Sequence, residues 1–170
     1  YVTATIDYTL LPNGDIQPTA DDSFHYGEVI REGTLDLYDA YQYLLGQASA
    51  YRIDTSRAGI GGWSAGGFNA NVLTHSRDFT NMNGLRATIG ASDIYPLSTT
   101  GLFGGVRVFD NNYNPVTMLA SFSVDTGYSG GSSFEADCAA LNDVGHTCIA
   151  EVLPGAGHDV WFHLEPLRNP

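Results

Sequence analysis

One serine in the sequence has neighbours that suit a catalytic nucleophile. Ser64 lies in "GIGGWSAGGF", residues 59 to 68, where small residues surround it. The five residues from Gly62 to Gly66 fit the pattern Gly-x-Ser-x-Gly, in which a serine occupies a strained turn between a strand and a helix. A glycine-rich turn with a solvated serine is the alternative, but the motif lies between a predicted strand and a predicted helix. We therefore predict that Ser64 is a nucleophile and that the Ala65 amide, at the positive end of the helix, donates to an oxyanion.

A serine hydroxyl needs a histidine to remove its proton and a carboxylate to orient that histidine. Of five histidines, only His158 directly follows a predicted strand, in "VLPGAGHDVWFH", where glycines allow the chain to turn back over the sheet edge. Asp125 follows the apolar run "VTMLAS" and is the predicted carboxylate. Asp93, in "IGASDIY", is the alternative acid. The predicted triad is Ser64, Asp125 and His158, in that chain order.

Alternating strands and helices must position these side chains. Helical patterns separate most of the short apolar runs that predict strands: Val2 to Tyr8, Arg57 to Gly61, Arg86 to Gly90, Val116 to Ser121 and Thr147 to Leu153. Such alternation is typical of a parallel sheet covered by helices on both faces. We expect a single α/β domain over residues 1–170 with a mostly parallel sheet of about five strands.

The motifs together resemble the α/β-hydrolase superfamily, and within it the esterase, lipase and acyl-peptidase branches. The likeness rests on "TATIDYTLLPNG", "YDAYQYLL", "YRIDTSRAGIGGWSAGG", "VLPGAGH" and the order Ser64, Asp125, His158. The residue pattern around Ser64 also resembles that of prolyl oligopeptidase catalytic domains. The resemblance implies a serine hydrolase without metal or cofactor, acting on a small-molecule or polymeric ester. An acyl-peptidase is the alternative reaction.

The sequence departs from the family pattern at its start. In the family, further strands and a His-Gly-Gly-Gly type loop, which donates a second oxyanion amide, precede the strand that matches Val2 to Tyr8 here. We expect a truncated fold in which this strand forms an open edge, and therefore a homo-oligomer or a complementing N-terminal fragment. A hydrolase-like module that binds without catalysis is a further alternative.

Aromatic residues near the predicted site are candidates for a substrate pocket, with core packing as the alternative role. These are Trp63, Tyr95, Phe103 and Trp161.

Composition excludes several classes of partner. The net charge is −12, and all seven basic residues are arginine; a chain this acidic is a poor partner for nucleic acid. No apolar run approaches the roughly 18 residues of a membrane span. Cys138 and Cys148 predict a disulfide, with two reduced buried thiols as the alternative. A disulfide and an acidic surface together favour a secreted or extracellular protein.

Overall fold

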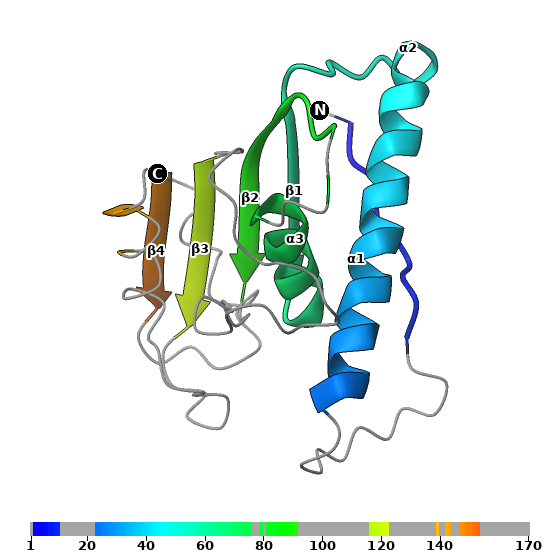
Figure 1. The fold of residues 1–170 in the computed structure, drawn as a ribbon. Coiled ribbons are helices and arrows are strands. Elements are labelled where there is room, and N and C mark those ends of the chain that lie inside the picture. The colour runs from blue at the N-terminus through cyan, green and yellow to red at the C-terminus, as the bar shows by residue number, and fades with distance from the viewer. Residues whose placement is uncertain are drawn as a thin grey trace.

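The computed structural model describes residues 2–10, 23–75, 79, 81–91, 116–122, 139, 142–143 and 147–153. The elements of this part of the chain (Figure 1) follow in the order α1 (Ser23–Gly46), α2 (Ala48–Tyr51), β1 (Ala58–Trp63), α3 (Ala65–His75), β2 (Leu85–Ala91), β3 (Val116–Phe122) and β4 (Thr147–Leu153). The predicted α/β architecture is confirmed.

The sheet of the described residues has four strands in the order β1-β2-β3-β4, and every neighbouring pair is parallel. Because each strand lies beside the next one in sequence and runs in the same direction, each connection crosses from one end of the sheet to the other. The carboxyl ends of all four strands consequently lie at one end of the sheet, and Figure 1 shows the arrowheads of β2, β3 and β4 there.

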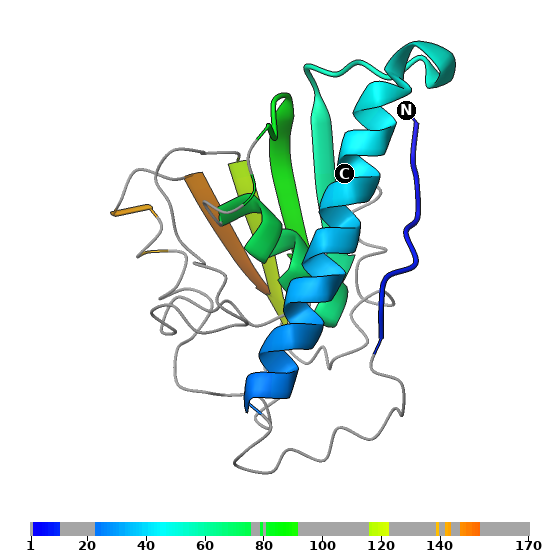
Figure 2. The ribbon, with the colours of Figure 1, turned by 45° about the vertical axis from the view of Figure 1, so that its right-hand side comes forward.

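The predicted strand over Val2 to Tyr8 is wrong. Residues 2–10 have no strand pairing and run beside α1 (Figure 2). The Thr9 amide donates to Asp36 Oδ2 of α1 at 2.6 Å, and a Cβ added at Gly33 of α1 would lie 3.2 Å from the Tyr8 ring. The segment is rich in residues that favour strands, but a strand forms only where its backbone can pair with another strand. Helix α1, which lies beside the segment, has no free strand edge to pair with. The described sheet therefore has β1 and β4 as its two outer strands, and association at an open edge stays a prediction.

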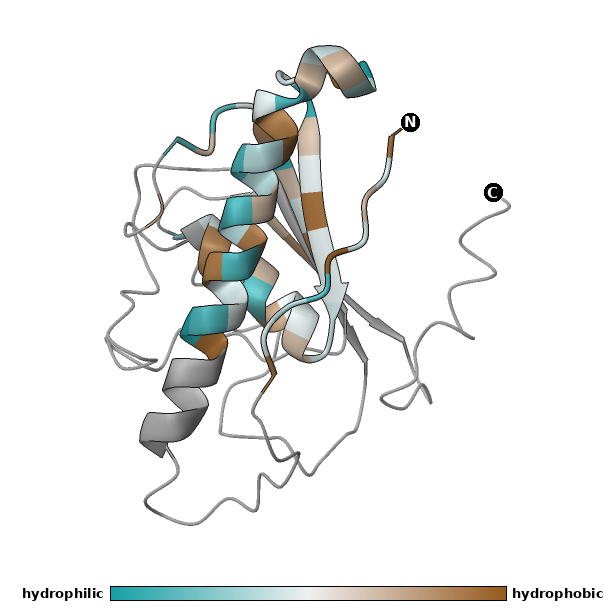
Figure 3. Cartoon of the chain, turned by 90° about the vertical axis from the view of Figure 1, so that its right-hand side faces the viewer, coloured by the Kyte–Doolittle hydropathy of each residue, from teal (hydrophilic) through white to brown (hydrophobic). Residues whose placement is uncertain are grey.

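Helix α1 forms where the sequence has apolar residues at helical spacing. Figure 3 shows both apolar and polar residues on the visible side of this helix, and its residues range from buried (Ile30, Tyr41) to exposed (Asp39, Tyr43), as expected when one side packs and the other meets water. Its buried side contributes Ile30 and Tyr41 to the core, whose other members come from α3 and from the segment leading into β2: Phe68, Val72, Leu73, Phe79, Met82 and Leu85. The core thus lies between α1, α3 and the sheet.

Both long helices cover the same face of the sheet (Figure 2). On the opposite face, Ile89 of β2 and Ile149 of β4 are 43% and 53% exposed. Both residues are register partners of Met118 in β3, so they belong to the same face of the sheet. A parallel sheet normally has helices over both faces, and the described helices supply one of these layers.

Among the described helices, none combines the length and apolar character needed to cross a membrane.

Candidate active site

Ser64 occupies the turn between β1 and α3, as the motif predicts. Its φ angle is 54°, in the left-handed region. An L-residue with a Cβ pays about 1–2 kcal/mol for this conformation. Within the described part of the chain, the other non-glycine residues with positive φ are Arg52, which ends α2, and Asn81, which precedes β2. Ser64 is thus held in a strained conformation between a strand and a helix.

Gly62 makes this turn possible. A Cβ at position 62 would lie 2.3 Å from the Gly66 carbonyl carbon and 2.7 Å from the Gly67 amide nitrogen. Both are backbone atoms of the first turn of α3, so they cannot swing away as a side chain could. By contrast, a Cβ at Gly66 would meet nothing within 4 Å. The close approach of the two backbones therefore requires glycine at position 62, whereas position 66 has room for a side chain.

The first helical hydrogen bond of α3 begins at the serine itself. The Phe68 amide donates to the Ser64 carbonyl oxygen at 3.0 Å. The amides of the first turn, starting with Ala65, therefore have no acceptor within the helix and lie at its positive end. No acidic residue occurs in this first turn to offset the dipole. A developing negative charge beside Ser64 would meet a favourable field.

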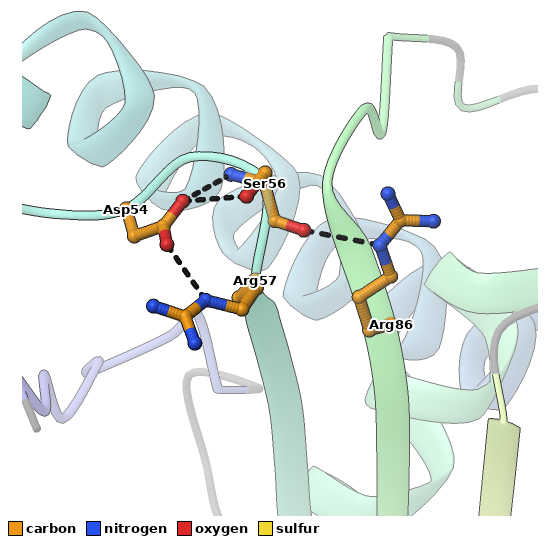
Figure 4. A network of polar contacts seen from close by, with 4 residues as sticks. All are labelled: Asp54, Ser56, Arg57 and Arg86. Carbon is orange, nitrogen blue, oxygen red and sulfur yellow. Dashed lines mark hydrogen bonds and ion pairs between the residues drawn. The ribbon is translucent and has the colours of Figure 1, made fainter.

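A polar network fixes the start of β1, the strand that ends at Ser64 (Figure 4). Asp54 accepts hydrogen bonds from the Ser56 amide at 3.0 Å and the Ser56 hydroxyl at 2.6 Å, and from Arg57 Nε at 2.7 Å. Arg86 Nε of β2 donates to the Ser56 carbonyl at 3.0 Å. The Ser56 and Arg57 donors lower the pKa of Asp54 to about 2. This network lies at the end of the sheet away from the serine, so its role is structural.

The predicted acid and base, Asp125 and His158, lie outside the described residues, as does the alternative acid Asp93. The strands that lead to them are described. β3 ends at Phe122, β4 at Leu153 and β2 at Ala91, all at the edge where β1 ends. The three strands that precede the candidate positions therefore end at the same end of the sheet as β1, which precedes Ser64. The triad itself stays a prediction.

Of the predicted pocket residues, the structure describes Trp63. Its side chain is 37% exposed immediately before the serine. Trp63 is two residues after Gly61, whose register partner is Ile89, so both side chains belong to the sheet face away from α3. Tyr95, Phe103 and Trp161 lie outside the described residues.

Cys148 in β4 is buried, and its sulfur is disulfide-bonded. The Asn142 side chain makes two hydrogen bonds to the backbone of this residue: Oδ1 accepts from the Cys148 amide at 2.8 Å, and Nδ2 donates to the Cys148 carbonyl at 3.1 Å. Cys138 lies outside the described residues, so the pairing of Cys138 with Cys148 stays a prediction.

Among the described residues, no group of three or more His, Cys, Asp or Glu could hold a metal ion.

Within the described residues, a parallel sheet carries a strained serine between a strand and its helix, as in the α/β-hydrolase fold. The chain is similar to the acylaminoacyl peptidase of Pyrococcus horikoshii, with a TM-score of 0.56 and 20% sequence identity over 82% of this chain. It spans about a quarter of that protein, 26% of its length. At this identity the likeness shows the fold. No protein-family model and no curated protein matches the sequence.

Proposed function

We propose that the protein is a serine hydrolase that cleaves carboxylic esters through an acyl-enzyme on Ser64. The observation that carries the proposal is the left-handed backbone of Ser64 between β1 and α3. A strained non-glycine residue persists only where its surroundings hold it there, and such residues cluster at functional sites. A structural turn at this position would be more stable with glycine.

In the proposed mechanism, Ser64 Oγ attacks the ester carbonyl while His158 accepts its proton. Asp125 orients the imidazole and stabilises its charged form. The Ala65 amide, at the positive end of α3, donates to the tetrahedral oxyanion. His158 then protonates the leaving alcohol, and water attacks the acyl-enzyme by the same route. No metal or cofactor takes part. The described residues supply one oxyanion donor, so a second donor would come from elsewhere.

An acyl-peptidase is the second candidate, because the similar solved structure is an acylaminoacyl peptidase. The two reactions share the acyl-enzyme and differ in the leaving group. An amine leaves less readily than an activated alcohol and depends more on protonation by His158. Initial rates on p-nitrophenyl acetate and on an N-acyl-aminoacyl p-nitroanilide separate them. Turnover of the ester alone supports the esterase, and comparable turnover of the anilide supports the peptidase.

The bonded sulfur of Cys148 also supports an oxidising environment, and we propose that the protein acts outside the cell. The intact mass of the native protein before and after reduction and alkylation tests the disulfide.

A fluorophosphonate probe tests the central proposal, because only an activated serine reacts with it quickly. We expect the wild-type chain to be labelled and Ser64→Ala to be unlabelled. Ser49→Ala, which removes an exposed hydroxyl on α2, is the matched control and should be labelled at the wild-type rate. His158→Ala should abolish labelling. Asp125→Asn and Asp93→Asn should differ, with the larger loss identifying the acid.

If the wild-type chain labels no faster than Ser64→Ala, the hydrolase proposal fails. A binding module that keeps the turn without the chemistry would then be favoured.

A further inference from the structure

Helix α3 carries the amides behind Ser64, and all of its residues from Gly67 to Thr74 are buried. It lies between the sheet and α1 (Figure 1). Small apolar residues form much of its surface, and Ala70 and Val72 are fully buried. The hydrophobic effect is non-directional, so apolar burial by itself does not specify one orientation of the helix. A buried hydrogen bond is directional and can select one arrangement.

Such a bond joins α3 to the sheet. Thr74 Oγ1 of α3 lies 2.5 Å from Thr88 Oγ1 of β2, and the two residues are 2% and 0% exposed. The Thr74 hydroxyl donates to the Ala70 carbonyl at 2.8 Å. Because a hydroxyl has one proton, the proton between the two threonines comes from Thr88. The last turn of α3 is therefore tied to the middle of β2.

The other side of the helix is closely confined by α1. Asn69 is 3% exposed, and a Cβ added at Gly33 would lie 2.6 Å from its Nδ2. Asn69 Oδ1 is also 3.5 Å from Thr34 Oγ1. These contacts limit sideways movement of α3 near its centre. The threonine pair then determines its tilt against the sheet.

We infer that Thr74 and Thr88 are positioning residues for the Ser64 site, because their hydrogen bond sets the tilt of α3 and with it the direction of the Ala65 amide. The catalytic consequence rests on the proposed function. Thr74 is nine residues beyond Ala65, or about 13 Å along the helix. A tilt of about 5° over that length moves the amide by about 1 Å, and a displacement of this size can cost about 100-fold in rate.

The double variant Thr74→Val/Thr88→Val tests the inference. It removes both hydroxyls while keeping the side-chain shapes, a change that is often nearly neutral for stability because no buried partner is orphaned. We expect a urea midpoint close to that of the wild type, shifted amide resonances for Ala65 and Gly66, and fluorophosphonate labelling slower by about 10- to 100-fold. Thr74→Ser/Thr88→Ser, which keeps both hydroxyls, should restore the resonances and most of the rate.

Tyr41→Phe is the matched control. The Tyr41 hydroxyl donates to the Asn83 carbonyl at 3.0 Å, so the variant removes a partly buried hydrogen bond that does not involve α3. We expect it to lower the urea midpoint without shifting the Ala65 resonance or slowing labelling. If Tyr41→Phe shifted the resonances and slowed labelling as much as the double variant does, a general loosening of the fold would explain both results. The inference would then be overturned.

Unchanged Ala65 and Gly66 resonances in the double variant would also overturn it. The amide resonances do not depend on catalysis, so they test the positioning role of the two threonines even if the wild-type chain is not labelled by the probe. A failure of the wild type to be labelled would refute the proposed function and would leave the positioning inference standing. Should the double variant fail to fold, Thr88→Val keeps the bond from Thr74 to Ala70 and carries the same test.

Discussion

At the scale of single residues, the conformation of Ser64 opposes stability. Its φ of 54° is unfavourable for any residue with a Cβ. Gly62 relieves none of this strain, since its role is to let the backbone of α3 approach. The fold therefore retains a strained serine where glycine would fit better. The proposed role of the hydroxyl as a nucleophile would explain that choice.

The first prediction compares two substitutions of this serine. Ser64→Gly should be more stable than Ser64→Ala by about 1 kcal/mol, because glycine adopts the left-handed conformation without a Cβ penalty. Urea unfolding measures the difference, and neither variant should react with the probe. Equal stability of the two variants would show that the turn is not strained.

A second prediction concerns Gly84, in the turn before β2. Its φ is +87°, and a Cβ there would collide with the Thr55 carbonyl oxygen. Gly84→Ala should therefore lower the unfolding free energy by about 2 kcal/mol or more. Gly46→Ala is the control, since a Cβ there meets nothing within 4 Å, and it should be neutral or slightly stabilising. A Gly84→Ala variant as stable as Gly46→Ala would contradict the geometry of this turn.

At the scale of elements, β1 is fixed at both ends by different means. Its end is held by the close backbone packing of Gly62 on α3, whereas its start is held by the Asp54 network (Figure 4). The carboxylate acts there through hydrogen bonds and not through burial, because the Asp54 side chain is exposed. Its effect should accordingly depend on pH.

A third prediction follows from the pKa of Asp54. Hydrogen bonds from the Ser56 hydroxyl and Arg57 lower this pKa from 3.8 to about 2 in the folded protein. The folded state then binds the proton less tightly than the unfolded state does, so the stabilisation is complete above pH 3.8 and is lost as the pH falls towards 2.

The urea midpoint measured through this range should fall less steeply in Asp54→Asn than in the wild type. Asp39→Asn, an exposed carboxylate on α1 outside the turn, is the charge-matched control and should keep the wild-type slope. Identical slopes for Asp54→Asn and the wild type would show that Asp54 is not the source of the pH dependence of stability.

At the scale of the whole molecule, charge repulsion and an open sheet act against each other. A net charge of −12 keeps copies apart at low salt. Yet β1 is one of the two outer strands of the described sheet, and the sheet face away from α3 exposes Ile89 and Ile149. An open strand edge invites pairing.

The fourth prediction is that stability rises with ionic strength. Screening of the acidic surface should raise the thermal midpoint between about 10 mM and about 150 mM NaCl, where the screening length falls from about 30 Å to about 8 Å. Differential scanning calorimetry measures the midpoint. A midpoint that falls over this range would mean that attractive ion pairs outweigh the repulsion.

The fifth prediction concerns association. Light scattering coupled to size exclusion at about 150 mM salt, where repulsion is screened, should give a mass above the 18.2 kDa of one chain. A single species of one-chain mass without a bound partner would contradict it.

The sequence by itself determined the elements near the serine and their order. Apolar runs and glycine spacing predicted β1, α3 and the turn between them, because these features depend on residues close together in the chain. Parallel neighbours followed from the alternation of strands and helices, since a crossover helix returns the chain in the same direction. The sequence also predicted that Asp125 and His158 follow the ends of strands, although both residues lie outside the described part of the chain.

Only the tertiary structure decided where Val2 to Tyr8 lies and what holds α3 in place. The composition of the first segment suits a strand, but strand formation depends on an available edge, and the segment lies on α1 instead. Thr74 and Thr88 are fourteen residues apart and carry no motif, and their contact exists because α3 packs on β2. Pairings between distant residues arise from packing geometry, which a local pattern does not encode.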